Sequence, residues 1–286
     1  MIKLMIDSAA DISKQEADEK GIIMIPMLIT IGEEEFYDGV NLSPQGFWEK
    51  LIESDVLPKT SLINTFRFEE AFEKHTRNGD ELIVITISSK LSGTYESARQ
   101  AAEKFPGKVY VVDSLNACVG ERLLCDFALR LLKQGLSAKA IIEELEDKKK
   151  NIKVMALLGT LAYLKKGGRI SSTVAFAGEM ISLKPVVGIV DGEVKLIGKA
   201  LGSRKGNNLL SRLVQEVGGI DFSMPYATIW SGLDNSLLDK YIKDSASLWA
   251  GHTDNIPKHI LGATIGTHVG PGVVGVAFFE NREKLK

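Results

Sequence analysis

The sequence predicts an α/β protein of two α/β domains, the first with a parallel sheet flanked by helices and the second with a mixed sheet covered by helices. Three observations predict this fold class. The chain has 286 residues, more than the roughly 100–200 residues of one ordinary domain. Hydrophobic residues make up 44% of it, which is enough for sizeable cores. Strand-like and helix-like segments alternate through the first half, and a hairpin signal follows early in the second half.

In the first half, short apolar runs predict strands, and the segments between them predict helices. This alternation is typical of parallel strands joined by crossover helices. Strands are predicted at 2–6, 22–31, 82–87 and 108–112, and helices at 14–20, 43–53, 66–77, 93–104, 119–133 and 138–150. Gly135 is placed to end the fifth helix, and Ser137 to cap the sixth.

The polar segment 147–151 is the predicted boundary between an N-terminal domain of residues 1–151 and a C-terminal domain of residues 152–286. Its three lysines are interpreted as a solvated last turn, favoured by the helix dipole, rather than as a phosphate-binding patch. Beyond it, Asp191-Gly192 predicts a two-residue hairpin turn between two strands. Strands are predicted at 184–190, 193–200, 226–230, 259–265 and 273–279, and helices at 205–217 and 236–249.

Composition argues against several classes of protein. Lys and Arg number 35 against 37 Asp and Glu, giving a net charge of −2, so a general nucleic-acid or anionic-membrane binder is not expected. Cys118 and Cys125 lie seven residues apart in a predicted helix, about 10 Å along its axis, which is too far for a disulfide. No apolar run approaches the ~18 residues of a membrane helix, and Asp7 interrupts the first one. We therefore expect a cytoplasmic protein without a transmembrane segment.

Two motifs do not indicate the sites with which they are usually associated. The segment 270–275 matches G-x-G-x-x-G, but it leads into a β-rich run instead of opening a helix, so it does not indicate a dinucleotide site. Asp7 and Asp11 are spaced four residues apart, wider than the acidic pair of common phosphotransferases. Asp11 is interpreted as a loop or helix-cap hydrogen-bonding group. The four histidines form no H-x-x-x-H pair, so no metal site is expected.

Hydroxyl-rich turns are the strongest candidates for a binding site. One is Pro58-Lys59-Thr60-Ser61, and the other is the segment 88–95, Ser-Ser-Lys-Leu-Ser-Gly-Thr-Tyr, which follows a predicted strand and leads into a helix. Ligands of parallel α/β sheets lie outside the carboxyl ends of strands, and a helix N-terminus there attracts anions. Ser92, with the small Gly93 behind it, and Thr60 are thus candidates to bind a carboxylate or phosphate. Ordinary helix capping explains the same residues.

Two further small-residue turns each contain one notable polar group. Arg169, in Gly167-Gly168-Arg169-Ile170-Ser171, supplies a cation that a carboxylate can use, and His268, in the turn 267–272, can donate a hydrogen bond or titrate. A structural role for His268 is the alternative. Met and small residues at 24–29 and 176–181 either line an adaptable apolar cavity or pack in the core.

In order and spacing, these motifs resemble the DegV family. The matching residues are Asp7-Ser8-x-x-Asp11, Lys59-Thr60-Ser61, Ser88-Ser89-x-Leu91-Ser92-Gly93-Thr94-Tyr95, Val112-Asp113-Ser114, Gly167-Gly168-Arg169-Ile170, Lys184-Pro185, Arg204 and His268-x-Gly270-x-Gly272. The similarity extends from Asp7 to about Phe279. One departure is Leu62-Ile63, where the family commonly has Gln-Pro; this bears on head-group or chain-length preference.

The resemblance implies one long-chain fatty acid bound in the cleft between the two domains, and no cofactor. By position, the hydroxyls of Thr60 and Ser92 would hold the carboxylate, with Ser61 and Gly93 beside them. His268 and Arg169 would belong to the head-group network. Some members present the fatty acid to an ATP-dependent fatty-acid kinase, and Arg204 would lie on the surface that meets it.

The leading hypothesis is therefore a fatty-acid carrier without chemistry of its own, which holds or presents its ligand for lipid metabolism. One alternative is an esterase-like hydrolase with Ser92 as nucleophile and His268 as base, although Ser92 lies in Leu-Ser-Gly and not in a G-x-S-x-G elbow. The other is a carrier of a different apolar anion, such as an isoprenoid acid.

Overall fold

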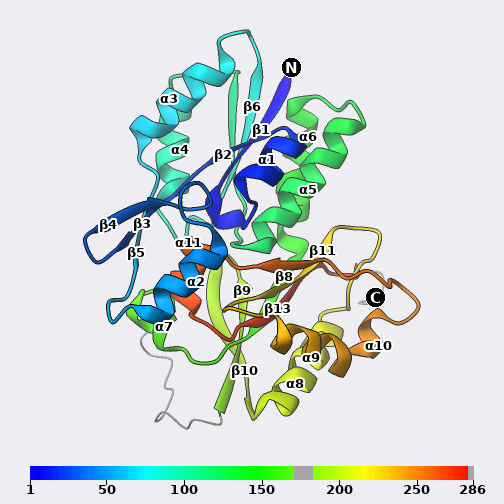
Figure 1. Ribbon diagram of the computed structural model, residues 1–286. Coiled ribbons are helices and arrows are strands. Elements are labelled where there is room, and N and C mark those ends of the chain that lie inside the picture. The colour runs from blue at the N-terminus through cyan, green and yellow to red at the C-terminus, as the bar shows by residue number, and fades with distance from the viewer. Residues whose placement is uncertain (171–182, 283–286) are drawn as a thin grey trace.

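The computed structural model describes residues 1–170 and 183–282. It has the predicted fold class: a parallel sheet with its helices lies above a mixed sheet with its helices in Figure 1. The first sheet has the order β2-β1-β6-β7, and each neighbouring pair is parallel. Its strands are β1 (Ile2–Asp7), β2 (Ile22–Ile25), β6 (Glu81–Thr86) and β7 (Val109–Asp113).

Helices cover both faces of this parallel sheet. In Figure 1, α3 and α4 lie on one side of it and α1, α5 and α6 on the other. The bounds in the first half are η1 (Ser8–Ala10), α1 (Lys14–Lys20), α2 (Pro44–Glu53), α3 (Thr65–Thr76), α4 (Thr94–Ala102), α5 (Val119–Lys133), α6 (Ala138–Lys148) and η2 (Lys149–Asn151). The predicted cap of α6 is confirmed, since the Ser137 hydroxyl accepts from the amide of Ala140.

The predicted strand at 22–31 is wrong as one element. Pro26 interrupts it, and β3 (Leu28–Ile31) leaves the parallel sheet to form a separate antiparallel one with β4 (Glu34–Tyr37) and β5 (Lys59–Ser61). Proline has no N–H to give a sheet ladder, which favours the break. Thr60 therefore lies on a short strand paired with β3, and not in the turn that the sequence predicts.

The second sheet is mixed, as predicted, with the order β10-β9-β8-β13-β11-β12. Only its β11–β12 pair is parallel among the described strands. Its strands are β8 (Ile152–Leu157), β9 (Leu183–Val190), β10 (Glu193–Leu201), β11 (Tyr226–Trp230), β12 (Lys258–Ile260) and β13 (Val274–Phe279). Its helices are α7 (Ala162–Lys166), α8 (Ser203–Glu216), α9 (Ser236–Asp244), α10 (Ala246–Trp249) and α11 (Ala263–Val269).

Local turn chemistry explains the β9–β10 hairpin. Asp191 and Gly192 both have positive φ, 53° and 83°, as a two-residue turn of the primed type requires. The hairpin prediction is thus confirmed. The segment 270–275 leads into β13 and opens no helix, also as predicted.

Two element predictions in the second half are wrong. The strand expected at 259–265 ends at Ile260, and α11 begins at Ala263, because distant carboxylates cap this helix: Asp38 accepts from the amides of Ala263 and Thr264, at 3.1 Å each. The helix expected at 236–249 divides into α9 and α10 at Ser245, whose hydroxyl donates to the carbonyl of Tyr241 at 2.7 Å.

The lysines before β8 also differ from expectation. Lys149 is only 7% exposed, and its Nζ pairs with Glu146 at 2.7 Å, so this residue is not part of a solvated turn. η2 connects α6 to β8, the first strand of the mixed sheet. The division into residues 1–151 and 152–286 stays a prediction.

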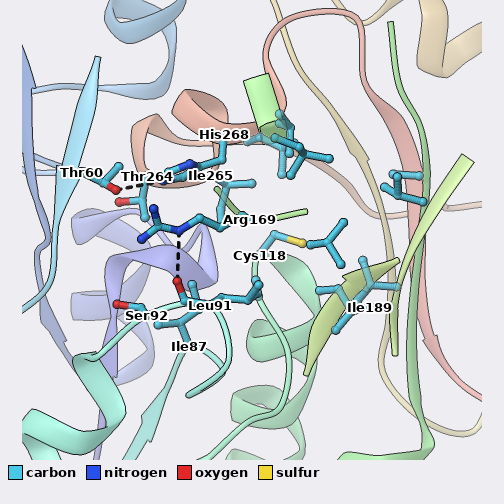
Figure 2. Close-up of a pocket in the computed structure, with 18 of the residues that line it drawn as sticks. Thr60, Ile87, Leu91, Ser92, Cys118, Arg169, Ile189, Thr264, Ile265 and His268 are labelled. Carbon is cyan, nitrogen blue, oxygen red and sulfur yellow. Dashed lines mark hydrogen bonds between the residues drawn. The ribbon is translucent and has the colours of Figure 1, made fainter. Parts of the chain in front are cut away.

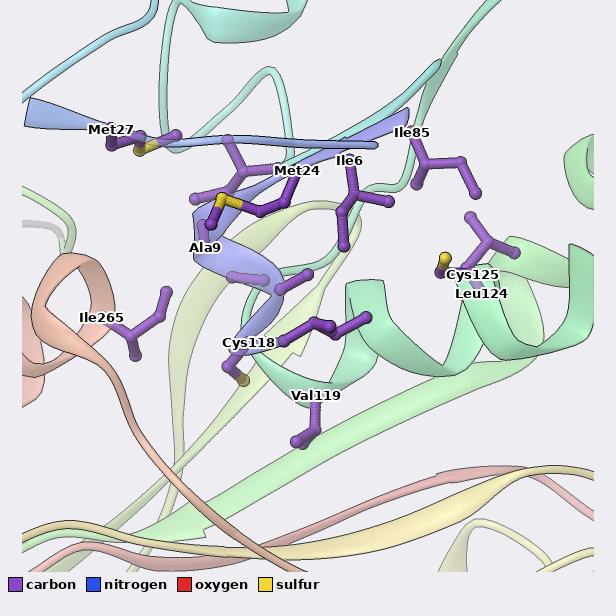
Figure 3. Packing of buried hydrophobic residues seen from close by; sticks show 14 of the residues in the cluster. Ile6, Ala9, Met24, Met27, Ile85, Cys118, Val119, Leu124, Cys125 and Ile265 are labelled. Carbon is purple, nitrogen blue, oxygen red and sulfur yellow. The ribbon is translucent and has the colours of Figure 1, made fainter. Parts of the chain in front are cut away.

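One cluster of buried apolar side chains links the two sheets. Figure 3 shows part of it, with Met24 of β2, Cys118 before α5 and Ile265 of α11 among the side chains drawn. Both Cys118 and Cys125 are buried free thiols. No helix in residues 1–170 and 183–282 has the length and apolar composition needed to cross a bilayer.

Candidate functional site

A cavity of about 260 Å³ lies between the two sheets and is polar at one end. Its apolar walls come from alternating residues of β8 and β9, together with β11 and the segment before α5. These residues include Val154, Ala156, Val187, Ile189, Ile229 and Cys118. At the other end, shown in Figure 2, Thr60, Ser92, Arg169 and His268 converge from four different elements. The arrangement suits a ligand with one polar end and one long apolar part.

Thr60 and His268 form the first part of the polar end. β5 presents Thr60, and the last turn of α11 presents His268, so His268 lies on a helix and not in the predicted turn. Thr60 Oγ1 and His268 Nε2 are 2.9 Å apart. The residues are 208 positions apart in the chain, and only the pairing of β5 with β3 and the packing of α11 bring them together.

The imidazole of His268 is neutral near pH 7. Burial disfavours its charged form, and the positive charge of Arg169 adds to this, so its pKa falls to about 4. Its Nδ1 is buried and finds no hydrogen-bond partner among the described residues. Since a buried N–H without an acceptor is costly, we assign the proton to Nε2, which then donates to Thr60. The Thr60 hydroxyl is left to donate into the cavity.

Ser92 forms the second part of the polar end, in the loop between β6 and α4. Its Oγ accepts from the amide of Thr94 at 3.2 Å and lies 2.9 Å from Thr94 Oγ1. Thr94 Oγ1 in turn accepts from the amide of Ile63 at 3.4 Å. If the Thr94 hydroxyl donates to Ser92, the Ser92 proton is left for a ligand, and a carboxylate has the lone pairs to accept it.

Arg169 supplies a positive charge between these two hydroxyls. In Figure 2 its guanidinium lies between the Thr60–His268 pair and Ser92. Its Nε donates to the carbonyl of Leu91 at 3.2 Å and one terminal nitrogen to the carbonyl of Gly167 at 2.6 Å. A half-buried cation held by carbonyls favours an anion at this end of the cavity.

The other predicted site residues lie at the margin of the cavity or outside it. Ser61 and Gly93 line the cavity at exposed positions, beside the half-exposed Leu62. Arg204 is exposed at the start of α8 and is not part of the cavity lining. Of the two Met-containing segments, 24–29 contributes Met27 to the lining; the segment 176–181 lies outside the described residues.

Thr264 and Cys118 are among the lining residues that sequence reasoning missed. The Thr264 hydroxyl donates to Asp38 Oδ2 at 2.5 Å across 226 positions, so no local pattern marks it. Asp11 acts as the sequence suggests: its carboxylate accepts from the amide of Gly262 at 2.7 Å, at the start of α11. Asp7 likewise accepts from the amides of Ala9 and Ile87, and burial raises its pKa to about 7.

The hydrolase hypothesis requires Ser92 beside His268. Among the described residues, the Ser92 hydroxyl is bonded to Thr94, and the His268 imidazole to Thr60. A histidine whose pKa is about 4 is also a weak base at neutral pH. No group of three or more His, Cys, Asp or Glu in residues 1–170 and 183–282 is placed to hold a metal ion.

The buried imidazole predicts a pH-dependent stability. The unfolded chain binds a proton at His268 near pH 6.5, whereas the folded chain resists it down to about pH 4. Stability should therefore fall as the pH falls from 6.5 towards 4. In the wild type, His268 should lower the unfolding free energy by about 1–2 kcal/mol between pH 7 and pH 5, and His268→Gln should lack this loss. Urea unfolding of both proteins at the two pH values measures the difference. Equal pH dependence in both proteins would contradict the assignment of a neutral His268.

Comparisons with known proteins agree on one family. The model of the DegV family matches residues 1–281. A DegV domain-containing protein of Clostridium perfringens is 33% identical and covers 96% of each chain. The solved structure of a fatty-acid-binding DegV family protein from Thermus thermophilus aligns with a TM-score of 0.87 at 28% identity, over 98% of this chain and 99% of that one. DegV of Bacillus subtilis, described as a fatty acid binding protein, aligns with a TM-score of 0.80 at 28% identity, over 96% of this chain and 98% of that one.

Proposed function

The chain belongs to the DegV family, and we propose from this premise that it binds one long-chain fatty acid and carries or presents it for lipid metabolism. The carboxylate would lie at Thr60 and Ser92, with Arg169 and His268 around it and Ser61 and Gly93 at the margin. The acyl chain would extend along the apolar walls. Fatty-acid binding by the proteins from Thermus thermophilus and Bacillus subtilis supports this proposal.

The observation that carries the proposal is the pair of hydroxyls, Thr60 and Ser92, at one end of an apolar cavity. With the proton of His268 on Nε2 and the Thr94 hydroxyl donating to Ser92, both O–H groups would be available to carboxylate oxygens. Each methylene buried along the walls contributes about 0.8 kcal/mol. Affinity would thus come mainly from burial of the acyl chain, and the hydroxyls would hold the carboxylate at the polar end of the cavity.

Presentation to a fatty-acid kinase is a further part of the proposal and comes from the family resemblance. Arg204, assigned by its position in the family motif, is the proposed contact residue; it is exposed on α8 and outside the cavity lining. A different apolar anion, such as an isoprenoid acid, would use the same polar end, and the identity of the extracted ligand distinguishes it from a fatty acid.

Mass spectrometry of the purified protein, native and after organic extraction, tests the proposal. One fatty acid per chain is the expected result; a bare protein that also refuses added fatty acids would contradict it. Thr60→Val and Ser92→Ala should each weaken binding about tenfold to a hundredfold, since a hydrogen bond to a charged group contributes about 1.5–3 kcal/mol.

Arg204→Glu is the control for these variants. It should bind the fatty acid as the wild type does and impair only phosphorylation of the bound ligand by a fatty-acid kinase. Unchanged fatty-acid affinity in both Thr60→Val and Ser92→Ala would contradict the assignment of the carboxylate to these hydroxyls. Unimpaired phosphorylation with Arg204→Glu would contradict the proposed kinase contact.

A further inference from the structure

The tip of the β9–β10 hairpin lies against the loop that contains Ser92. Gly192, the second residue of the hairpin turn, is buried, and its carbonyl accepts from the Ser88 hydroxyl at 2.8 Å. This bond spans 104 positions of the chain and joins the mixed sheet to the loop between β6 and α4. Neither Gly192 nor Ser88 is part of the cavity lining. The bond therefore lies beside the candidate site without belonging to it.

The hairpin tip is packed too closely for a side chain at Gly192. An added Cβ would lie 2.6 Å from Ser88 Oγ, 3.2 Å from Lys90 Cγ and 3.3 Å from Leu115 Cδ2. The φ of Gly192, 83°, is a second reason for glycine at this position. The tip thus contacts two loops of the parallel sheet, the one before α4 and the one before α5.

Ser88 in turn holds the loop up to Ser92. The Ser88 carbonyl accepts from the amides of Leu91 and Ser92, at 2.9 and 3.1 Å. The Ser88 hydroxyl accepts from the amide of Lys90 at 3.2 Å while it donates to the hairpin. The Ser88 amide donates to the carbonyl of Asn116 at 2.8 Å. Each polar group of Ser88 has a partner, so the place of Ser92 depends on where Ser88 is held.

Burial makes the bond between Ser88 and Gly192 difficult to replace. Ser88 is fully buried, so water does not compete for its hydroxyl. A shift of the hairpin tip would leave this hydroxyl without its acceptor, which is costly at a buried position. A hydroxyl that binds a ligand needs support of this kind, because hydrogen bonds weaken steeply as their geometry departs from the optimum.

We propose that Gly192 and Ser88 are positioning residues of the carboxylate site. The hairpin tip holds Ser88, and Ser88 holds the loop in the course that brings the Ser92 hydroxyl to the carboxylate. This inference rests on the proposed function. It makes the head-group site depend on a turn of the mixed sheet that does not line the cavity.

Affinities for palmitic acid in Ser88→Ala and Gly192→Ala test the inference. Each substitution should weaken binding about tenfold, because the hydrogen bond from Ser92 to a charged group is lost in part. Ser89→Ala is the matched control for the first, since Ser89 is exposed. Gly202→Ala is the control for the second: Gly202 follows β10, has a similar φ of 76°, and has no atom within 4 Å of an added Cβ. Both controls should bind palmitic acid within about twofold of wild type.

A Ser92→Ala background shows whether the effect passes through the Ser92 hydroxyl. If it does, the two serine substitutions are coupled, and Ser88→Ala should change affinity less than about twofold in that background. A tenfold loss there would overturn the inference, as would wild-type affinity in both Ser88→Ala and Gly192→Ala. Failure of the wild type to bind palmitic acid would instead contradict the proposed function.

A nuclear magnetic resonance measurement avoids dependence on how the Ser88 and Gly192 variants fold. The peptide unit of the Glu193 amide contains the Gly192 carbonyl, so the chemical shift of this amide nitrogen reports the bond to Ser88. Saturation with palmitic acid should change it in the wild type, and by less in Ser92→Ala. Contacts of the acyl chain with Val194, which lines the cavity, are common to both proteins and cancel in the comparison. Equal changes in the two proteins would overturn the inference.

Discussion

Ala156→Phe is expected to abolish fatty-acid binding and leave the protein folded. Ala156 lies on β8 opposite Val187, and both residues line the cavity. The cavity holds about 260 Å³, so a phenyl ring there keeps the acyl chain out of part of the space along the apolar walls. At about 0.8 kcal/mol per methylene, exclusion of six methylenes costs about 5 kcal/mol, or several thousandfold in affinity. The position of the hydroxyls would be unchanged.

Isothermal titration with palmitic acid, together with thermal unfolding, measures this effect. Because the ring enters an existing cavity, we expect a change in unfolding free energy of no more than about 1–2 kcal/mol. Glu193→Phe is a suitable control, since it adds the same ring at an exposed position on β10. Palmitic acid bound by Ala156→Phe with wild-type affinity would show that the acyl chain does not occupy this cavity.

Elements with local signals were predictable from the sequence. α5 has its predicted bounds, 119–133, because an amphipathic run there ends just before Gly135. The β9–β10 hairpin follows from Asp191-Gly192, whose residues suit a primed turn. In each case the residues that determine the element lie within it or next to it.

Elements formed by distant partners were not predictable in this way. β5 has three residues and no apolar alternation, and it exists because it pairs with β3. α11 follows β12 after two residues and depends on carboxylates of Asp11 and Asp38, which are more than 220 positions away. Propensity alone therefore favoured a longer strand at 259–265.

The candidate site shows the same division. Ser92 and Arg169 were identified from motifs, and the structure brings them to one end of a cavity. The bond between Thr60 and His268 and the lining role of Thr264 depend on β5 and α11, the elements that local signals miss. The sequence patterns thus identified candidate site residues, whereas the contacts among these residues depend on the three-dimensional fold.

Gly167→Ala is the second substitution with a large expected effect. Gly167 has φ −74°, which any residue adopts, so an alanine there causes no backbone strain. Its Cβ, however, would lie 2.3 Å from His268 Nδ1, closer than real atoms approach. The ring must move and lose its bond to Thr60, and we expect fatty-acid affinity to fall at least tenfold.

The neighbouring glycine separates this steric effect from a general loss of stability. Gly168 has φ +69° and no atom within 4 Å of an added Cβ, so Gly168→Ala should lower the unfolding free energy by about 1 kcal/mol and keep fatty-acid affinity. If His268 transmits the effect of Gly167→Ala, the two substitutions are coupled. In a His268→Ala background, Gly167→Ala should then change affinity less than twofold. A full tenfold loss in that background would mean that Gly167 acts on the ligand by another route, such as the Arg169 guanidinium that its carbonyl holds.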